Sequence, residues 1–306
     1  MVKKISYLFP GQGAQYVGMG KDLYDSCPAS RAVFDEAETL LSDIDIKGLC
    51  FEGPIEELTR TANSQVTILV ASIASLRALD SKGLNPVACA GLSLGELTSL
   101  VAAGAIGFED AVRLVKRRGE LMEQASLKNP GGMAPIIGLS FEGLNELCNE
   151  SGSEIANLNS PGQIVISGTK ESVENTIRLA TKKGARKCIP LGVSGPFHSS
   201  LMKDMAGLFK VELDKVKFSS PRIGVVSNVT ADYEKTPEEI RENLVRQLYS
   251  PVRWEESIRR IAGQGIDTFF EIGPGKVLKG LLRRIDSNLK VYNIEKAEDI
   301  TRITQL

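Results

Sequence analysis

No sign of charge dominates this chain of 306 residues: Lys and Arg together number 37, Asp and Glu 38, and the formal net charge is −1. The basic excess that accompanies general nucleic-acid binding is therefore missing. No apolar run approaches the roughly 20 residues that a transmembrane helix needs. The apolar start at Ile5–Phe9 is also too short for a signal peptide core. We expect a protein that binds neither nucleic acid nor membrane.

Cysteine is also scarce and dispersed. The five cysteines are Cys27, Cys50, Cys89, Cys148 and Cys188. The number is odd and no pair has the close spacing of a metal site, so we predict reduced thiols in a cytoplasmic protein and no bound metal. The triplet Asn228-Val229-Thr230 matches a glycosylation acceptor, but that interpretation requires secretion, and we set it aside.

The hydrophobic patterns predict an α/β fold with a second unit inside it. Strand patterns at residues 4–10 and 85–91, with helical patterns between and after them, indicate a parallel sheet covered on both faces. From Met133 to about residue 193 the order becomes β-α-β-β-α-β, which is the ferredoxin-like unit. Strands near residues 222–228 and 267–275, the latter expected to be the last, then complete the main sheet. We predict an α/β hydrolase-like domain from residues 1–128 and 197–306 with a ferredoxin-like insert at 129–196.

One serine lies between two glycines in the stretch Ala90–Glu96, which reads AGLSLGE. The bare G-x-S-x-G pattern arises by chance about 0.2 times in a chain of this composition, so alone it is weak support. Its context strengthens it, because a strand precedes Ser93 and a helix follows. Such a turn lifts a serine hydroxyl above the sheet, and the N–H of Leu94 at the helix start would form half of an oxyanion hole.

A second oxyanion donor is expected from the glycine-broken loop FPGQGAQ. Gly11 and Gly13 allow close approach of the backbone, and the N–H of Gln12 is the candidate donor. A dinucleotide-binding loop is the rival interpretation, but it would need glycine where Tyr16 stands. A plain turn remains the ordinary alternative.

A nucleophilic serine needs a base, and the chain contains a single histidine, His198. A lone histidine is more often structural than catalytic, yet the order serine then histidine suits an α/β hydrolase-like scaffold. No acid stands out as its partner. Glu271 is a candidate, and a backbone carbonyl from the segment Gln247–Trp254 is the alternative.

The basic run RLVKRRGELM lies on a predicted helix. Charge runs usually face solvent, and we expect this for most of Arg113, Lys116, Arg117 and Arg118. One arginine turned inward would bind a carboxylate through two parallel hydrogen bonds, which lysine cannot do. Periodicity alone does not choose which arginine this is.

Seven segments in order resemble the malonyl-CoA:acyl carrier protein transacylases. They are FPGQGAQ, GLSLGE, the RRG that ends at Gly119, NSPGQIVISG, FHSSLM, QLYSPVRW and EIGPGKVL. The resemblance covers nearly the whole chain and implies the same fold. It also implies acyl transfer by a ping-pong route from malonyl-CoA to holo acyl carrier protein. No permanently bound cofactor is implied, and the coenzyme A thioester is a substrate.

The resemblance also implies roles for particular residues. Ser93 would carry the malonyl group, with His198 as base and then acid, and Gln12 and Leu94 as oxyanion donors. Arg118 would hold the free malonyl carboxylate. Further positions that match the family site are Gln247, whose carbonyl would orient the histidine, Phe197, whose ring would exclude an α-methyl group, and Asn159 and Gln65, with less defined roles.

Three positions depart from the family pattern. Leu92 stands where the family usually has histidine, although that position is not the catalytic base, and Val66 stands where proline often follows the Gln65 position. Pro135 lies in a predicted strand, where it removes a donor, so we expect it at an edge or at a strand start.

Other functions remain open. A serine hydrolase of thioesters or esters would share Ser93 and His198 but would not need Arg118, and a non-catalytic acyl-binding protein would need none of the three. A stand-alone acyltransferase of polyketide synthesis or malonate metabolism is a narrower alternative to type II fatty acid synthesis. A basic cluster in the insert, formed by Lys182, Lys183, Arg186 and Lys187, is a candidate contact for an acidic carrier protein.

Overall fold

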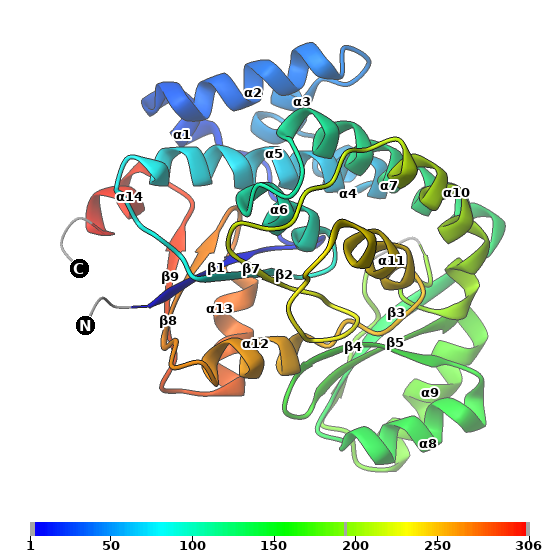
Figure 1. Cartoon of the computed structure of the whole chain (residues 1–306). Coiled ribbons are helices and arrows are strands. Elements are labelled where there is room, and N and C mark those ends of the chain that lie inside the picture. The colour runs from blue at the N-terminus through cyan, green and yellow to red at the C-terminus, as the bar shows by residue number, and fades with distance from the viewer. Residues whose placement is uncertain (1–3, 193–194, 304–306) are drawn as a thin grey trace.

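The computed structural model describes residues 4–192 and 195–303 and contains two separate sheets (Figure 1). The strands of the larger sheet are β1 (Ile5–Phe9), β2 (Ala88–Gly91), β7 (Gly224–Val226), β8 (Thr268–Ile272) and β9 (Lys290–Ile294). Their spatial order is β7-β2-β1-β8-β9, and every neighbouring pair is parallel. The predicted α/β class with a parallel sheet is thus confirmed.

Helices cover both faces of this sheet. The helices of the chain are α1 (Lys21–Ser26), α2 (Pro28–Leu40), α3 (Ile46–Phe51), α4 (Ile55–Thr59), α5 (Thr61–Asp80), α6 (Leu94–Ala102), α7 (Phe108–Lys128), α8 (Phe141–Ser151), α9 (Lys170–Lys182), α10 (Lys203–Asp214), α11 (Pro237–Gln247), α12 (Trp254–Ala262), α13 (Val277–Ile285) and α14 (Ala297–Ile303). In Figure 1, α5, α6 and α7 lie on one side of the sheet and α12 and α13 on the other. Among the described residues, no helix combines the length and apolar character needed to span a membrane.

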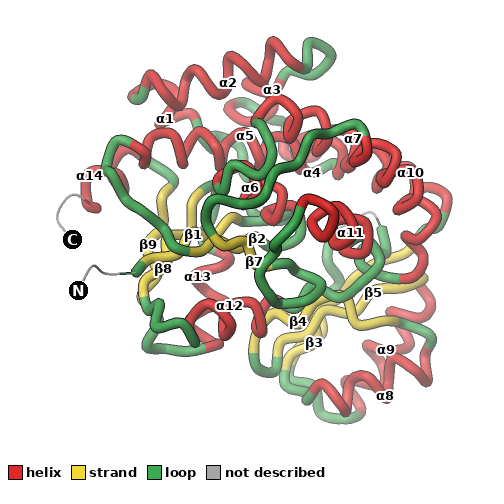
Figure 2. Tube along the Cα trace, viewed as in Figure 1, coloured by secondary structure: helices red, strands yellow, loops and turns green. Residues whose placement is uncertain are grey.

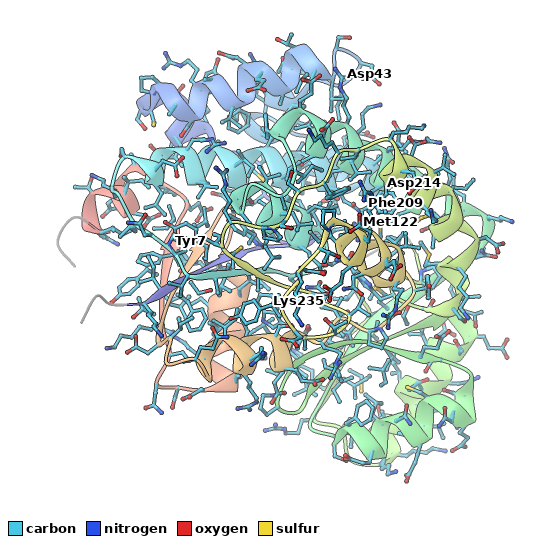
Figure 3. All side chains as sticks on the ribbon, in the orientation of Figure 1. Tyr7, Asp43, Met122, Phe209, Asp214 and Lys235 are labelled. Carbon is cyan, nitrogen blue, oxygen red and sulfur yellow. The ribbon has the colours of Figure 1, made fainter. Side chains whose placement is uncertain are left out.

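The alternation of side chains in β1 explains the two layers. Tyr7 and Phe9 point into the larger core, which also holds Met122 of α7 and Phe209 of α10 (Figure 3). Leu8 points the other way and packs in a second buried cluster with residues of α12 and α13. A strand buried on both faces is typical of a parallel sheet covered by helices, and it requires the nearly continuous apolar sequence seen here.

The smaller sheet is antiparallel and is drawn in yellow below α11 in Figure 2. It consists of β3 (Gly131–Ile137), β4 (Glu154–Ser160), β5 (Gln163–Thr169) and β6 (Lys187–Cys188), in the order β4-β5-β3-β6. With α8 and α9 this is the predicted β-α-β-β-α-β order. The strands fall between residues 131 and 188, and the division at 128/129 and 196/197 stays a prediction.

Three details differ from the sequence analysis. The strand expected at residues 185–193 is limited to the two residues of β6, and Val193 lies outside the described residues. The strand at 267–275 is not the last, because β9 follows and pairs with β8. Pro135 is neither at a strand start nor in an outer strand, since it lies within β3 opposite Val165. Its carbonyl accepts from the Ile189 N–H on the side of the two-residue β6, and the missing N–H faces the same side, where the ladder is short and its loss costs little.

Candidate active site

Ser93 occupies a strained turn between β2 and α6, with φ of 52° and ψ of −103°. A Cβ atom at Gly91 would lie 1.9 Å from the Gly95 carbonyl, and one at Gly95 would lie 2.2 Å from the carbonyl oxygen of Phe9. Any side chain at either glycine would therefore force the strand and helix apart. The two glycines permit the sharp turn that presents the serine hydroxyl, as the pattern predicted.

The Ser93 hydroxyl lies against His198: its Oγ is 2.9 Å from Nε2 of the imidazole. On the other side of the ring, Nδ1 is 2.7 Å from the backbone carbonyl of Gln247. Because a carbonyl only accepts, Nδ1 carries the proton and Nε2 is free to accept the serine proton. Burial and, to a smaller extent, the charge of Arg118 together lower the pKa of His198 from 6.5 to about 4, so the imidazole is neutral near pH 7.

Glu271 is not the acid that orients His198. Its carboxylate accepts hydrogen bonds from the backbone N–H groups of Leu278 and Lys279 at the start of α13, and from the Asn293 amide. This carboxylate caps a helix, a favourable place for negative charge. Of the two alternatives, the structure places the Gln247 carbonyl beside the imidazole.

The N–H groups of Gln12 and Leu94 are available as donors. Gln12 lies in the loop after β1, which lines the same cavity as Ser93, and Leu94 opens α6 directly after the serine. Neither N–H has a hydrogen-bond acceptor among the described residues. Gly11 brings this loop against the turn after β2, since a Cβ there would lie 2.3 Å from the Leu92 carbonyl oxygen. Two free amides next to a serine hydroxyl form a geometry suited to an oxyanion.

Arg118 is the arginine that turns inward from α7, and its side chain is only 1% exposed. Its guanidinium donates to Gln65 Oε1 at 2.5 Å, to Gln247 Oε1 at 2.9 Å and to Ser93 Oγ at 3.2 Å. Burial lowers the pKa of Arg118 to about 10, while the charge of Glu96 opposes this, so the group remains a cation near pH 7. The neighbouring cations of α7 instead form surface ion pairs: Arg113, Lys116 and Arg117.

A cavity of about 290 Å³ opens in front of Ser93 and His198. Phe197 lines it beside the histidine and is 4% exposed. The smaller sheet supplies the facing wall, through Met133, Pro135, Asn157, Asn159, Gln163 and Val165. The register shift between Ile155 and Asn157 turns the end of β4, so that Ile155 packs under α8 and α9 while Asn157 faces the cavity.

Two of the predicted residues take different positions around this cavity. Asn159 lines it, and its Oδ1 atom is buried without a hydrogen-bond partner among the described residues, so an acceptor is left for a ligand. Gln65 accepts a hydrogen bond from the Arg118 guanidinium through Oε1, and its Nε2 donates to Met122 Sδ at 3.0 Å. Leu92, one of the departures from the family pattern, lines the cavity as an apolar side chain.

The sequence analysis missed two residues that hold the serine turn. Asn228 Oδ1 accepts from the Ser93 backbone N–H at 2.6 Å, and Asn228 Nδ2 donates to the Gly91 carbonyl at 2.7 Å. Glu96 is fully buried, and its Oε2 accepts from the Asn228 N–H at 2.8 Å and from Gln247 Nε2 at 3.0 Å. A carboxylate among the small and apolar residues of α6 was a visible signal. The sequence pattern around Asn228 indicates only a glycosylation acceptor and gives no sign of this role.

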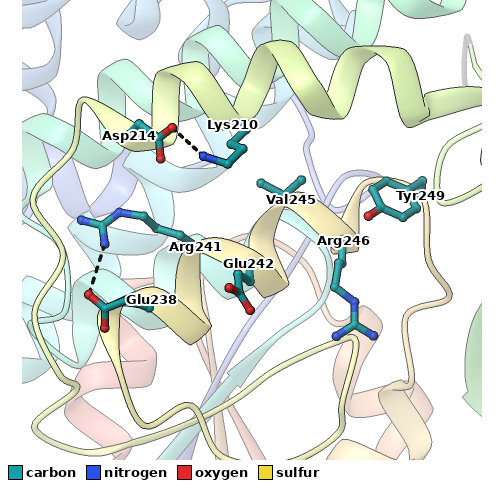
Figure 4. Close-up of a pocket in the computed structure, with 8 residues that line it drawn as sticks. All are labelled: Lys210, Asp214, Glu238, Arg241, Glu242, Val245, Arg246 and Tyr249. Atoms are coloured by element: carbon teal, nitrogen blue, oxygen red, sulfur yellow. Dashed lines mark hydrogen bonds and ion pairs between the residues drawn. The ribbon is translucent and has the colours of Figure 1, made fainter.

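A larger groove lies elsewhere, between α10 and α11 (Figure 4). It measures about 550 Å³, and ion pairs join Lys210 to Asp214 and Arg241 to Glu238 along it. None of the predicted site residues lines it. Among the described residues, no group of three or more His, Cys, Asp or Glu side chains is placed to hold a metal ion.

Comparison with known proteins gives consistent matches along the chain. A family model described as "Acyl transferase domain" matches residues 6–303. The malonyl CoA-acyl carrier protein transacylase of Bacillus subtilis is 47% identical over 98% of this chain and 96% of its own. The protein of that name from Staphylococcus aureus strain MRSA252 is 42% identical over 98% of each chain.

Solved structures agree in fold. An acyl carrier protein S-malonyltransferase from Vibrio cholerae superposes with a TM-score of 0.95 at 40% identity, over 98% of this chain and 100% of the other. A malonyl-transacylase in complex with a type II polyketide synthase acyl-carrier protein superposes with a TM-score of 0.96 at 40% identity, over 99% of each chain.

Proposed function

This chain belongs to the acyl transferase domain family, and we propose that it transfers the malonyl group from malonyl-CoA to the phosphopantetheine thiol of an acyl carrier protein. The observation that carries this proposal is the buried cation of Arg118, 3.2 Å from the Ser93 hydroxyl. A cation beside a nucleophile selects an acyl group that ends in a carboxylate. A general ester hydrolase has no use for that charge.

The first half-reaction forms a malonyl ester on Ser93. The Oγ atom attacks the thioester carbonyl while His198 Nε2 takes the hydroxyl proton, and the N–H groups of Gln12 and Leu94 hold the oxyanion. Collapse of the tetrahedral species breaks the carbon–sulfur bond. The imidazolium returns its proton to the leaving sulfur, which departs as coenzyme A thiol.

The second half-reaction reverses these steps with another thiol. The phosphopantetheine thiol of the carrier gives its proton to His198 and attacks the ester carbonyl. The Ser93 oxygen leaves and recovers the proton, and malonyl-carrier is released. The chemistry draws only on the side chains and backbone amides of the chain, and the coenzyme A thioester enters as a substrate.

Selection among acyl groups follows from the walls of the site. The forked guanidinium of Arg118 is suited to bind the malonyl carboxylate by two parallel hydrogen bonds. The ring of Phe197 beside His198 restricts substitution at the carbon next to the carbonyl. The free Asn159 Oδ1 is suited to accept a hydrogen bond from an amide of the pantetheine arm.

We assign the product to type II fatty acid synthesis, the pathway that the family resemblance implies. A polyketide carrier is the alternative, and the partner in the complexed structural neighbour favours it.

The docking contact on this chain is proposed to be the basic cluster of the smaller unit: Lys182, Lys183, Arg186 and Lys187. All four side chains are exposed, and Lys183 forms an ion pair with Glu146. Charge reversal there should slow transfer to the carrier and spare malonyl-enzyme formation, and unchanged transfer kinetics would reject this docking contact.

Intact-protein mass after brief incubation with malonyl-CoA tests the function, with wild type beside Ser93→Ala. A single malonyl adduct that requires Ser93 and moves to holo carrier protein is the expected result. Loss of the adduct to water at the same rate without carrier would favour a hydrolase. Absence of an adduct would contradict the proposed formation of a malonyl ester on Ser93.

A further inference from the structure

Arg118 is a buried cation without an anionic partner in direct contact. Its hydrogen-bond acceptors are the neutral oxygens of Gln65, Gln247 and Ser93, and no carboxylate forms an ion pair with it in the part of the chain that the structure describes. A buried charge is costly unless an opposite charge balances it. The counter-charge must therefore reach Arg118 through another group.

Glu96 is joined to Arg118 by one amide. The side chain of Gln247 donates from Nε2 to Glu96 Oε2 at 3.0 Å and accepts at Oε1 from Arg118 Nη2 at 2.9 Å. The amide dipole thus points its positive end at the carboxylate and its negative end at the guanidinium. Each of these hydrogen bonds involves one charged partner, which makes it stronger than a bond between neutral groups.

The same carboxylate is connected to the serine and the histidine. Gln247 Nε2 also donates to the Ser93 carbonyl at 3.0 Å, and the Gln247 backbone carbonyl accepts from His198 Nδ1. Glu96 Oε2 holds the Asn228 N–H, and the Asn228 side chain binds the Ser93 N–H. Glu96 touches neither reacting side chain, yet one intervening residue links it to each.

We propose that Glu96 is the positioning residue and buried counter-charge of the site, acting through Gln247 and Asn228 in place of the acid that contacts histidine in a Ser-His-acid triad. This inference rests on the proposed acyl transfer through Ser93. When His198 takes the serine proton, a second cation forms beside Arg118. Glu96 is the fixed negative charge of the protein that offsets it.

A second buried carboxyl, Glu234, lies close enough to interact with Glu96 but is not the counter-charge. It accepts from Asn243 Nδ2, at 3.2 and 3.1 Å, and burial together with the charge of Glu96 raises its pKa to about 8. Burial also raises the pKa of Glu96, but the Asn228 N–H, the Gln247 amide and Arg118 oppose it, and the result is about 7. Of the two carboxyls, Glu96 therefore ionises first, and Glu234 provides a matched control.

The variant Glu96→Gln removes the charge and keeps the hydrogen bonds. Both bonds end on Oε2, which the amide oxygen can replace, and Oε1 has no partner among the described residues. The expected result is a fall of about tenfold or more in the maximal rate of malonyl-enzyme formation at pH 8, with no rise in the half-saturating malonyl-CoA concentration. Glu234→Gln should stay within about twofold of wild type. Glu96→Asp should recover part of the loss, because it restores the charge.

The pH profile separates charge from packing. As pH falls and Glu96 is protonated, the wild-type rate should decline toward that of Glu96→Gln, so the two converge near pH 5 and diverge near pH 8.5. Equal rates at all pH values, or a constant ratio between them, would overturn the inference. If Glu96→Gln does not fold, the wild type decides alone, because a wild-type rate that is flat from about pH 8.5 to about pH 5.5 would contradict a titrating counter-charge. Failure of the proposed function is distinct, since the wild type would then form no malonyl adduct at all.

Discussion

The Nη2 atom of Arg118 donates to both the Ser93 hydroxyl and the Gln247 side chain, at 3.2 and 2.9 Å. One guanidinium therefore touches the proposed nucleophile and the residue whose carbonyl orients its base. Substrate carboxylate must compete for these hydrogen bonds, so recognition of malonyl and freeing of the serine hydroxyl are coupled events.

Replacement of this cation should separate recognition from chemistry. In Arg118→Lys a single ammonium cannot form two parallel hydrogen bonds, and we expect malonyl transfer to fall by about a hundredfold or more. Acetyl transfer, which presents no carboxylate, should fall much less. Steady-state rates with malonyl-CoA and acetyl-CoA measure the ratio, and the partly exposed neighbour in Arg117→Lys is the matched control. An equal loss of rate with malonyl-CoA and acetyl-CoA would mean that Arg118 does not recognise the malonyl carboxylate.

The acid limit that His198 sets on the reaction should lie far below that of an ordinary histidine. The base must be neutral, and burial with the nearby Arg118 lowers the pKa of His198 from 6.5 to about 4. The part of the rate that depends on the neutral imidazole should therefore be retained as pH falls through 6.5 and lost only near pH 4, whereas the wild type also loses rate at higher pH as Glu96 is protonated. Short acid pulses on Glu96→Gln, in which that carboxyl cannot titrate, isolate the histidine. A midpoint near 6.5 in this variant would show that the imidazole is not desolvated.

The serine turn should not tolerate a methyl group at Gly91. The new Cβ would lie 1.9 Å from the Gly95 carbonyl, and neither backbone segment can move without separating β2 from α6. We expect Gly91→Ala to lose about 3 kcal/mol or more of the free energy of unfolding. Gly207→Ala in α10 is the control, because nothing lies within 4 Å of its Cβ and helical alanine should be neutral or stabilising. Urea unfolding of both variants decides, and equal stabilities would contradict the steric account.

Asn228 should contribute to the rate through the position of Ser93. Asn228→Ala removes the acceptor of the Ser93 N–H and the donor to the Gly91 carbonyl. A misplaced nucleophile can cost about a hundredfold in rate, and we expect a loss of that order in malonyl-enzyme formation. The exposed Asn85→Ala is the control. A wild-type rate in Asn228→Ala would show that the strained turn keeps its conformation without the two hydrogen bonds of the Asn228 side chain.

Phe197 should set the limit on branching next to the thioester. Phe197→Ser opens space in the cavity beside His198, so we expect methylmalonyl-CoA to acylate Ser93 in this variant at least about tenfold faster than in wild type. Intact mass after incubation with each donor measures this. Continued exclusion of methylmalonyl would assign the selection to another wall, for instance Met133.

The features that depend on interactions between residues close in sequence were predictable from the chain alone. The Gly91-Leu92-Ser93-Leu94-Gly95 turn was predictable because two glycines and a flanking strand and helix constrain it locally. The β-α-β-β-α-β order was predictable because its strands and helices have distinct periodicities. The brief β9 was missed because its side chains are only half buried and alternate weakly.

Which charges face inward was not predictable from the chain, because it depends on how distant elements pack in the folded protein. The periodicity of α7 left four cations equivalent, and packing of the helix against α5 and α6 buried Arg118 while surface carboxylates paired with its neighbours. Glu271 and Glu96 both sit in apolar contexts, yet one caps a helix and the other meets Gln247 and Asn228. Gln247 and Asn228 each lie more than a hundred residues from Glu96 along the chain. A buried charge takes its role from what surrounds it in space, and local sequence does not contain that information.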